Sequence, residues 1–135
     1  MAETRAKLKE LDPVWARITS EAEAAVADEP LLGGVIHSSV LHHTTLPRAL
    51  AYRISLKLAS GEMSEQILRE ICDEAHAADP ALAQAARADI AAVYDRDPAC
   101  HRFLQPLLFF KWFQALQCYR VAHWLWSEGR RDLAY

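Results

Sequence analysis

The chain has few of the residues that mark metal, disulfide and phosphate sites. It contains three cysteines and four glycines in 135 residues. The three cysteines, Cys72, Cys100 and Cys118, are far apart and odd in number, so their spacing predicts neither a disulfide framework nor a zinc site. The glycines are scattered, which excludes a glycine-rich phosphate loop. This cysteine usage favours a reducing, cytoplasmic setting.

An excess of charge of one sign and a long apolar run are also missing. The formal net charge is -3 and the pI about 6.0, which argues against a protein that binds nucleic acid by neutralising phosphates. Residues 1–12 are charged and show no apolar region of a signal peptide. The most apolar segment is interrupted by Lys111, Arg120 and His123, so it is not predicted to span a membrane. We therefore expect neither nucleic acid nor a membrane as a partner.

Signals of β-structure are absent, and helical signals take their place. There is no sustained apolar–polar alternation and no Asn-Gly or Asp-Gly hairpin turn. Apolar residues instead recur at helical spacing between prolines. Three pairs, Asp12-Pro13, Asp79-Pro80 and Asp97-Pro98, each place a capping acceptor before a proline suited to the first helical position. The sequence predicts one all-α domain over residues 1–135, a multi-helix bundle of about six to eight helices.

The spacing of apolar residues and prolines predicts six helices. The first spans residues 13–28, and the second, weakened by Gly33-Gly34, spans residues 31–42. The third follows Pro47, carries apolar residues at four-residue steps, and stops at Ser60-Gly61, a plausible C-terminal glycine. Ser64 caps the fourth, which ends before Pro80. The fifth covers residues 80–94, and the sixth covers residues 106–126 and ends near residues 128–129.

The sixth segment, PLLFFKWFQALQCYRVAHWLW over residues 106–126, is unusually rich in Phe, Trp, Tyr and Leu. Aromatic side chains remove a large area from water and dominate the energetics of cores and interfaces. Apolar residues lie on almost every face of this segment, which favours a core helix buried all round over a membrane-surface helix. Such a helix requires a large partner surface.

The residues themselves offer little catalytic chemistry. His37, His42 and His43 are spaced by five and one, not by the three or four residues that place metal ligands on one helical face, so we interpret them as surface or interface histidines. No nucleophile elbow and no motif that activates a thiolate is present. The cysteines are expected to be small buried apolar residues. Taken alone, Asp97 is explained by helix capping.

Two stretches together carry a family resemblance. Residues 89–99 read DIAAVYDRDPA, followed by PLLFFKWFQALQCYR at residues 106–120 and AHWLW at residues 122–126. This combination resembles the amino-terminal helical domain of bacterial serine acetyltransferases. Weaker similarity extends to Trp15, residues 29–30, 46–52, 57–58 and 75–80, so it covers nearly the whole chain. Trp112 stands where the family usually has glycine, and Cys118 where it usually has alanine; the tryptophan requires local space.

The resemblance implies an activity and a site. Family members transfer acetyl from acetyl-CoA, their co-substrate, to the hydroxyl of L-serine and give O-acetylserine for cysteine synthesis. The aspartate of the R-D-P motif, here Asp97, reaches the serine-binding pocket, where a carboxylate can pair with the substrate ammonium group. The general-base histidine belongs to a following left-handed β-helix, so neither His101 nor His123 corresponds to it. No cofactor or metal site is expected in this chain.

The resemblance also implies partners. Family members are typically hexamers, dimers of trimers held together by the helical domain, and some bind O-acetylserine sulfhydrylase through a carboxyl-terminal tail. Residues 1–135 show no hexapeptide repeat, so we expect an isolated oligomerisation domain that contributes Asp97 and has no activity alone. The alternative is a stand-alone helical module that binds another protein without catalysis.

Overall fold

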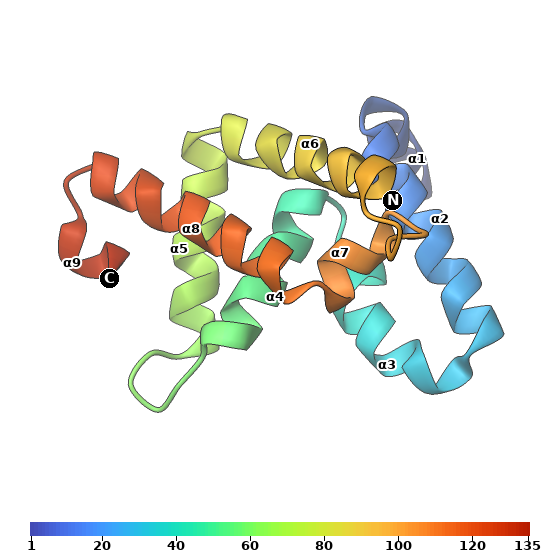
Figure 1. Ribbon diagram of the computed structural model, residues 1–135, viewed down its shortest axis with the longest axis horizontal. Coiled ribbons are helices and arrows are strands. Elements are labelled where there is room, and N and C mark those ends of the chain that lie inside the picture. Colours follow the sequence, from blue (N-terminus) through green and yellow to red (C-terminus); the bar gives the residue numbers. More distant parts are fainter.

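The fold is built from helices joined by short connections (Figure 1). The computed structural model describes the backbone of residues 1–135 and the side chains of all but residues 5 and 8–10. Over this backbone nine α-helices are assigned and no strand, so the all-α prediction is confirmed. The helices are α1 (Ala2–Leu11), α2 (Pro13–Asp28), α3 (Gly33–Ile36), α4 (Leu46–Leu58), α5 (Glu65–Ala78), α6 (Ala81–Arg96), α7 (Leu104–Phe109), α8 (Lys111–Ser127) and α9 (Arg131–Ala134).

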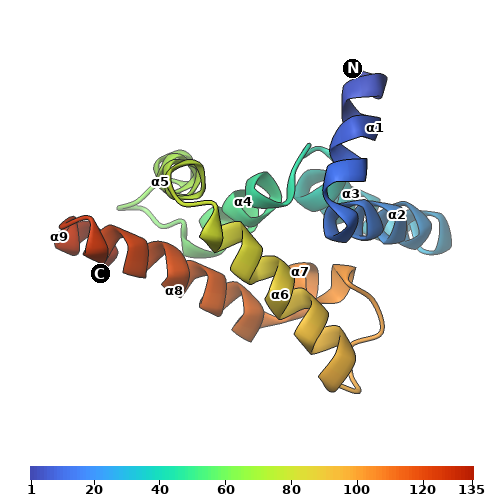
Figure 2. The same cartoon turned by 90° about the horizontal axis from the view of Figure 1, so that it is seen from above.

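The helices α4, α5, α6 and α8 pack into the central part of the molecule, with α2 and α3 at one end. Figures 1 and 2 show the C-terminus beside α9 near one end of the longest axis and the N-terminus in the other half of the molecule, with α1 pointing away from α2. The helices α1 and α9 were not predicted, because half of residues 2–11 are charged and α9 is a single turn. The remaining predicted helices are present near their expected positions.

Capping side chains define two helix starts as predicted. Asp12 Oδ1 accepts the backbone N–H of Trp15 at 3.1 Å at the start of α2. Ser64 Oγ accepts the N–H of Ile67 at 3.3 Å before α5. Asp79 is not the N-cap residue that the sequence predicted, because α6 begins at Ala81 after Pro80; its Oδ1 still accepts the N–H of Ala81 at 3.0 Å. Each bond satisfies an amide that the helix itself leaves without a partner.

The second predicted helix is continuous but mixed in type. It comprises a 3₁₀ turn η1 (Pro30–Leu32), the α-helical turn α3, and a π-helical turn η2 (His37–Leu41). The N–H of His42 reaches the carbonyl of His37 at 2.8 Å, the five-residue step of a π-helix.

Of the two helices expected to end at a glycine, α8 does so and α4 does not. Gly61 does not adopt a left-handed conformation, so the predicted glycine cap of α4 is wrong; α4 ends at Leu58, and its C-terminal cap residue is Ala59. Gly129 has φ 78° after α8. The N–H groups of Gly129 and Arg130 reach the carbonyls of Trp126 and Leu125, the paired bonds of a Schellman motif. The end of α8 near Gly129 is therefore confirmed.

Two apolar clusters form the interior. The larger one joins α2, η2, α4 and α6 to α7 and the start of α8, with Phe113, Ile18, Ile90 and Leu107 among its fully buried members. The smaller one joins α4 and α5 to the second half of α8 through Ile54, Cys72 and Leu125 and their neighbours. Since α4 and α8 contribute to both clusters, they connect the two halves of the molecule.

The aromatic segment is not one uninterrupted helix, contrary to the prediction. It breaks at Phe110, whose backbone is extended (φ -91°, ψ 99°), into α7 and α8. The break removes the helical partners of two buried carbonyls. Gln114 Nε2 donates to the carbonyl of Leu107 at 2.9 Å, and Arg53 Nη2 donates to that of Leu108 at 2.8 Å. Side chains thereby replace the missing helical bonds.

Arg53 is an unusual member of this interior. Its side chain is buried in α4, and its Nη1 donates to the hydroxyl of Ser39 at 3.3 Å. Burial lowers the pKa of the Arg53 guanidinium from its usual value. A guanidinium remains charged at neutral pH even so, since its ordinary pKa lies above 12. The charged Arg53 side chain thus stabilises the break before α8 through its bond to the carbonyl of Leu108.

The helix α8 does not bury all its faces, which corrects the prediction of a core helix. Its inner face carries Phe113, Val121 and Leu125 together with the buried amides Gln114 and Gln117. Its outer face carries Trp112, Tyr119 and Trp126, which are 50%, 62% and 42% exposed. Because Trp112 points outward, its bulk in place of the family's glycine requires no space in the core.

The neighbours Phe113 and Trp112 offer a test of this orientation. Replacing Phe113 by Ala leaves a cavity in the larger cluster and is expected to lower the free energy of unfolding by about 3–5 kcal/mol. Replacing Trp112 by Ala removes a half-exposed ring and should cost less than about 1 kcal/mol. Urea denaturation followed by circular dichroism measures both. A larger loss for Trp112 than for Phe113 would contradict the assigned helix face.

Candidate functional site

The sequence-predicted site residue, Asp97, lies where α6 ends and the connection to α7 begins. Its N–H still donates to the carbonyl of Val93 at 2.9 Å, so Asp97 is the C-terminal cap residue of α6. No helix begins at Pro98, and the prediction that Asp97 is an N-cap is therefore wrong. The residues that follow lack the apolar periodicity that follows Asp12-Pro13 and Asp79-Pro80.

The carboxylate of Asp97 organises a turn instead. Oδ1 accepts the N–H of Ala99 at 2.8 Å, and the backbone carbonyl accepts the N–H of Cys100 at 2.9 Å. This is an Asx turn, which an aspartate or asparagine can form. The side chain is half-buried, and Oδ2 has no hydrogen-bond partner among the residues whose side chains the structure describes. One oxygen therefore shapes the loop while the other stays available to a ligand.

The connection over residues 97–103 is held from within by Gln105. Its Oε1 accepts the backbone N–H groups of both His101 and Arg102, the latter at 3.0 Å. The thiol of Cys100 donates to the carbonyl of Arg102 at 3.3 Å. These bonds give an irregular connection a defined backbone path, and His101 is exposed on its outer side.

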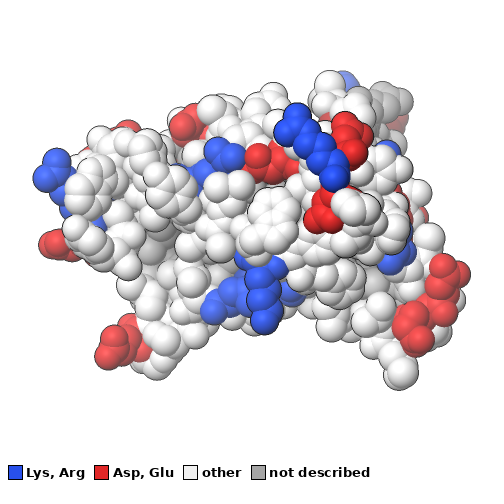
Figure 3. All heavy atoms as spheres, in the orientation of Figure 1, with Lys and Arg blue, Asp and Glu red and all other residues white. Residues whose placement is uncertain are grey.

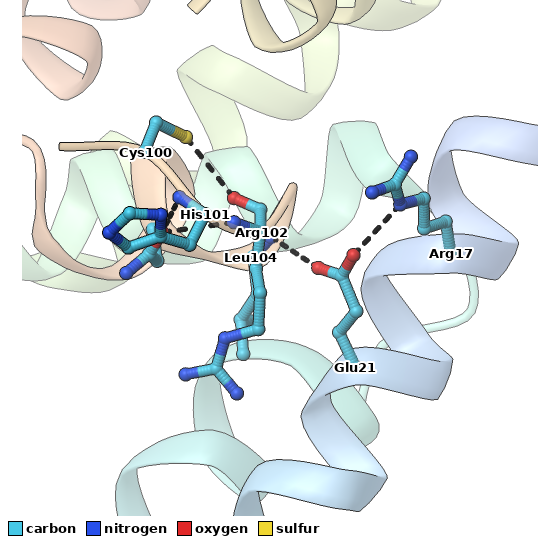
Figure 4. Close-up of polar contacts among 7 residues, drawn as sticks. Arg17, Glu21, Cys100, His101, Arg102 and Leu104 are labelled. Carbon is cyan, nitrogen blue, oxygen red and sulfur yellow. Dashed lines mark hydrogen bonds and ion pairs between the residues drawn. The ribbon is translucent and has the colours of Figure 1, made fainter. Parts of the chain in front are cut away.

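The same connection is held from outside by α2. Figure 4 shows Glu21 turned toward both Arg17 and Leu104. Glu21 Oε1 accepts Nε of Arg17 at 2.8 Å, and Oε2 accepts the backbone N–H of Leu104 at 2.9 Å. The guanidinium of Arg17 lies 3.9 Å from the ring centre of Phe103 and 4.5 Å from that of Tyr94. No signal in the sequence connected α2 with this loop.

A second polar network joins the two stretches that carry the family resemblance. Asp89 Oδ2 in α6 accepts Gln117 Nε2 at 2.8 Å and Arg120 Nη2 at 2.9 Å, both from α8. Each partner is at least partly buried. The motif residues Asp89, Gln117 and Arg120 are thus explained by packing α6 against α8. The sequence motifs contain these three positions but do not predict this contact.

The histidines predicted at the surface are arranged as expected. His37 and His42 are exposed, and His43 is half-buried, with Nε2 at 2.9 Å from the carbonyl of Ser38. Burial lowers the pKa of His43. A hollow of about 380 Å³ borders His37 and His43, beside Trp15. Among the residues with described side chains, no group of three or more His, Cys, Asp or Glu could hold a metal ion.

The three cysteines act as apolar residues, as predicted. Cys72 and Cys100 are buried and Cys118 is half-buried. Burial raises the pKa of the Cys72 thiol to about 12 and also raises the pKa of Cys100 and Cys118. Since the thiolate is the nucleophile, none of the three is activated near neutral pH. The site therefore offers a carboxylate for binding and no nucleophile.

No helix within the described part of the chain is long and apolar enough to cross a bilayer. The arrangement around Asp97 can bind a cation or an ammonium group, because it presents one unpaired carboxylate oxygen on a braced loop.

Comparison with known proteins finds similarity to serine acetyltransferases. A family model described as serine acetyltransferase, N-terminal, matches residues 14–118. A serine acetyltransferase of Salmonella typhimurium is 47% identical over 126 residues, which cover 93% of this chain and 46% of that relative. The chain thus spans about half the length of the curated relatives it matches.

Solved structures agree with the sequence comparison. The serine acetyltransferase of Brucella abortus strain S19 in complex with coenzyme A matches with a TM-score of 0.89 and 42% identity, covering 95% of this chain and 51% of that one. The serine acetyltransferase of Neisseria gonorrhoeae in complex with serine matches with a TM-score of 0.87 and 43% identity, covering 90% of this chain and 51% of that one.

The burial of the thiols predicts an order of alkylation. At pH 8, iodoacetamide should modify the half-buried Cys118 before the buried Cys72, because a thiol with a pKa of about 12 is almost wholly protonated at that pH. In urea all three thiols should react alike. Mass spectrometry of tryptic peptides measures the order. Rapid labelling of Cys72 in the folded chain would contradict its burial.

Proposed function

Because this chain belongs to the serine acetyltransferase family, we propose that it is the amino-terminal domain of a serine O-acetyltransferase. Such an enzyme transfers an acetyl group from acetyl-CoA to the hydroxyl of L-serine in cysteine biosynthesis. The match over residues 14–118 supports the assignment. So do the coenzyme A and the serine that the Brucella and Neisseria relatives bind.

The role that we propose for Asp97 is recognition of the serine ammonium group. The observation that carries this proposal is that only one of its two carboxylate oxygens is used within the fold. Oδ1 is engaged in the turn at Ala99, which fixes the direction of the carboxylate, while Oδ2 remains available. A carboxylate pairs strongly with an ammonium group, and a fixed carboxylate orients the serine hydroxyl for attack.

The chain supplies binding rather than the proton transfer in this proposal. Acetyl transfer to a hydroxyl requires a general base, and a base must lie within hydrogen-bond reach of the proton it removes. His101 is exposed beside the loop and does not correspond to the family's general base, which lies in the β-helix. The acetyl-CoA site and the base therefore belong, in this proposal, to a catalytic domain, and O-acetylserine sulfhydrylase is a proposed partner of the whole enzyme.

Asp97→Asn separates the two functions of the carboxylate. We suggest a hybrid enzyme in which this chain replaces the matching segment of the Salmonella relative. Asparagine retains the Asx turn but loses the charge. A lost charge-assisted hydrogen bond is worth roughly 1.5–3 kcal/mol, so the KM for serine should rise about ten- to a hundredfold. The KM for acetyl-CoA should change less than about twofold, because Asp97 is proposed to contact serine and not acetyl-CoA.

Two controls accompany this experiment. Asp95→Asn removes an exposed carboxylate two residues away and should leave both KM values unchanged. The chain alone should form no O-acetylserine from serine and acetyl-CoA, as detected by release of free coenzyme A. Activity of the isolated chain, or an equal rise in both KM values for Asp97→Asn, would contradict the proposed role.

A second function, self-association, is supported by the outer face of α8. Trp112, Tyr119 and Trp126 are seven residues apart, so they lie on one face of the helix, and all three are exposed. The buried face of the same helix carries two amides beside its apolar residues. Figure 3 shows uncharged side chains over much of α8. Exposed aromatic surface of this kind marks interfaces.

We propose that this aromatic stripe (Trp112, Tyr119 and Trp126) contacts another copy of the chain, consistent with a dimer-of-trimers assembly. The alternative, a stand-alone helical module that binds a different protein, would use the same surface. Uncharged aromatic rings suit either kind of partner, and sedimentation of the pure chain distinguishes self-association from binding of a different protein.

Tyr119→Glu should weaken self-association, because it places a charge in the centre of the stripe. Analytical ultracentrifugation of the parent chain should show oligomers that dissociate in the variant. Leu31→Glu is the matched control: Leu31 is 91% exposed and lies far from α8 in sequence, in η1. A parent chain that stays monomeric at high concentration would favour the module that binds a different protein.

A further inference from the structure

We propose that Arg17 and Glu21 of α2 are positioning residues for Asp97, and through it for serine recognition. This inference rests on the proposed role of Asp97. Neither residue hydrogen-bonds to Asp97; both act on the two ends of the connection that carries it. The contact is long-range, since Glu21 and Leu104 are 83 residues apart in sequence.

Arg17 ties the start of the connection to its end. Tyr94 lies in the last turn of α6, three residues before Asp97, and Phe103 lies immediately before α7. The two rings are in edge contact, with centroids 5.1 Å apart. The Arg17 guanidinium lies against both rings, at 4.5 Å and 3.9 Å. A planar cation on two aromatic faces fixes their separation, and Asp97 lies on the chain segment between them.

Glu21 fixes the end of the connection in a second way. The residue before α7, Phe103, provides no side-chain cap. The first amide of α7, Leu104 N–H, is satisfied instead by Glu21 Oε2 from α2. A carboxylate at this end is also favoured by the helix dipole. The other oxygen, Oε1, holds Arg17 by its Nε at 2.8 Å. One carboxylate therefore links the cap of α7 to the cation between the two rings.

The partial exposure of this pair separates positioning from stability. The side chain of Arg17 is 42% exposed and that of Glu21 is 16% exposed. Ion pairs at the surface contribute little to the stability of a fold. Catalytic rates, in contrast, respond strongly to displacements of about 1 Å in a substrate-binding group. Removing the pair should therefore affect the use of serine more than it affects folding.

The test uses the hybrid enzyme with the variants Arg17→Ala and Glu21→Ala. Each should raise the KM for serine about tenfold and leave the KM for acetyl-CoA within about twofold. Arg17→Lys retains the charge but not the planar stacking, and should raise the serine KM nearly as much as Arg17→Ala. Glu21→Gln retains an oxygen for the Leu104 amide, so it should raise the serine KM less than Glu21→Ala does.

The pair Glu65 and Arg69 on α5 provides a matched control. It has the same four-residue spacing, and the Arg69 guanidinium lies 5.2 Å from the ring centre of Tyr52. Its side chains are 37% and 41% exposed, comparable to Arg17. Arg69→Ala should leave the serine KM unchanged. An equal rise for Arg69→Ala and Arg17→Ala would show a general structural effect and would overturn the inference.

The outcomes separate this inference from the proposed function. If Asp97→Asn raises the serine KM and Arg17→Ala and Glu21→Ala do not, the inference is wrong and the role of Asp97 stands. If Asp97→Asn has no effect, the proposed role fails, and the inference fails with it. Equal rises in both KM values for the α2 variants would also overturn positioning.

A second measurement does not depend on an active hybrid. In the chain alone, the N–H of Ala99 reports the Asx turn through its bond to Asp97. Arg17→Ala should shift the Ala99 amide resonance and speed its hydrogen exchange several-fold, because a loosened connection exposes the amide more often. Arg69→Ala should leave both unchanged. An unperturbed Ala99 amide in Arg17→Ala would overturn the inference.

Discussion

The interruption of the helix at Phe110 is the constraint on which the arrangement of the carboxyl-terminal half depends. A buried carbonyl without a partner costs about 1–3 kcal/mol, and the break creates two of them, at Leu107 and Leu108. Gln114 and Arg53 satisfy them. Because Arg53 comes from α4, its bond to Leu108 joins the end of α7, just before α8 begins, to the centre of the molecule. From there α8 packs against α4, α5 and α6, and Asp89 can meet Arg120.

The polarity of α8 follows from this arrangement. Buried amides such as Gln114 and Gln117 are needed on the inner face, because they bond to a carbonyl at the break and to Asp89. The inner face also carries the buried ring of Phe113, while three further rings, Trp112, Tyr119 and Trp126, lie exposed on the outer face. Exposed rings of this kind are consistent with a surface that another protein chain covers.

The helix α2 serves the candidate site as well as the core. Asp12, which caps it, also accepts Nε and Nη2 of Arg87 at 3.0 and 2.8 Å and so joins α2 to α6. Two turns later, Glu21 caps α7. One helix thus contacts the elements on both sides of the connection that presents Asp97. These contacts restrain a carboxylate that lies on an irregular connection.

Local patterns in the sequence determined the all-α class, most helix positions, the caps at Asp12 and Ser64, and the family resemblance that singled out Asp97. These depend on spacing and on neighbours within a few residues. Only the tertiary structure decided that the aromatic segment breaks at Phe110, that Asp97 forms an Asx turn rather than an N-cap, and that Glu21 and Arg17 brace its loop. Each of these rests on bonds between residues far apart in the chain, and the free energy of such bonds depends on burial and geometry that no local pattern records.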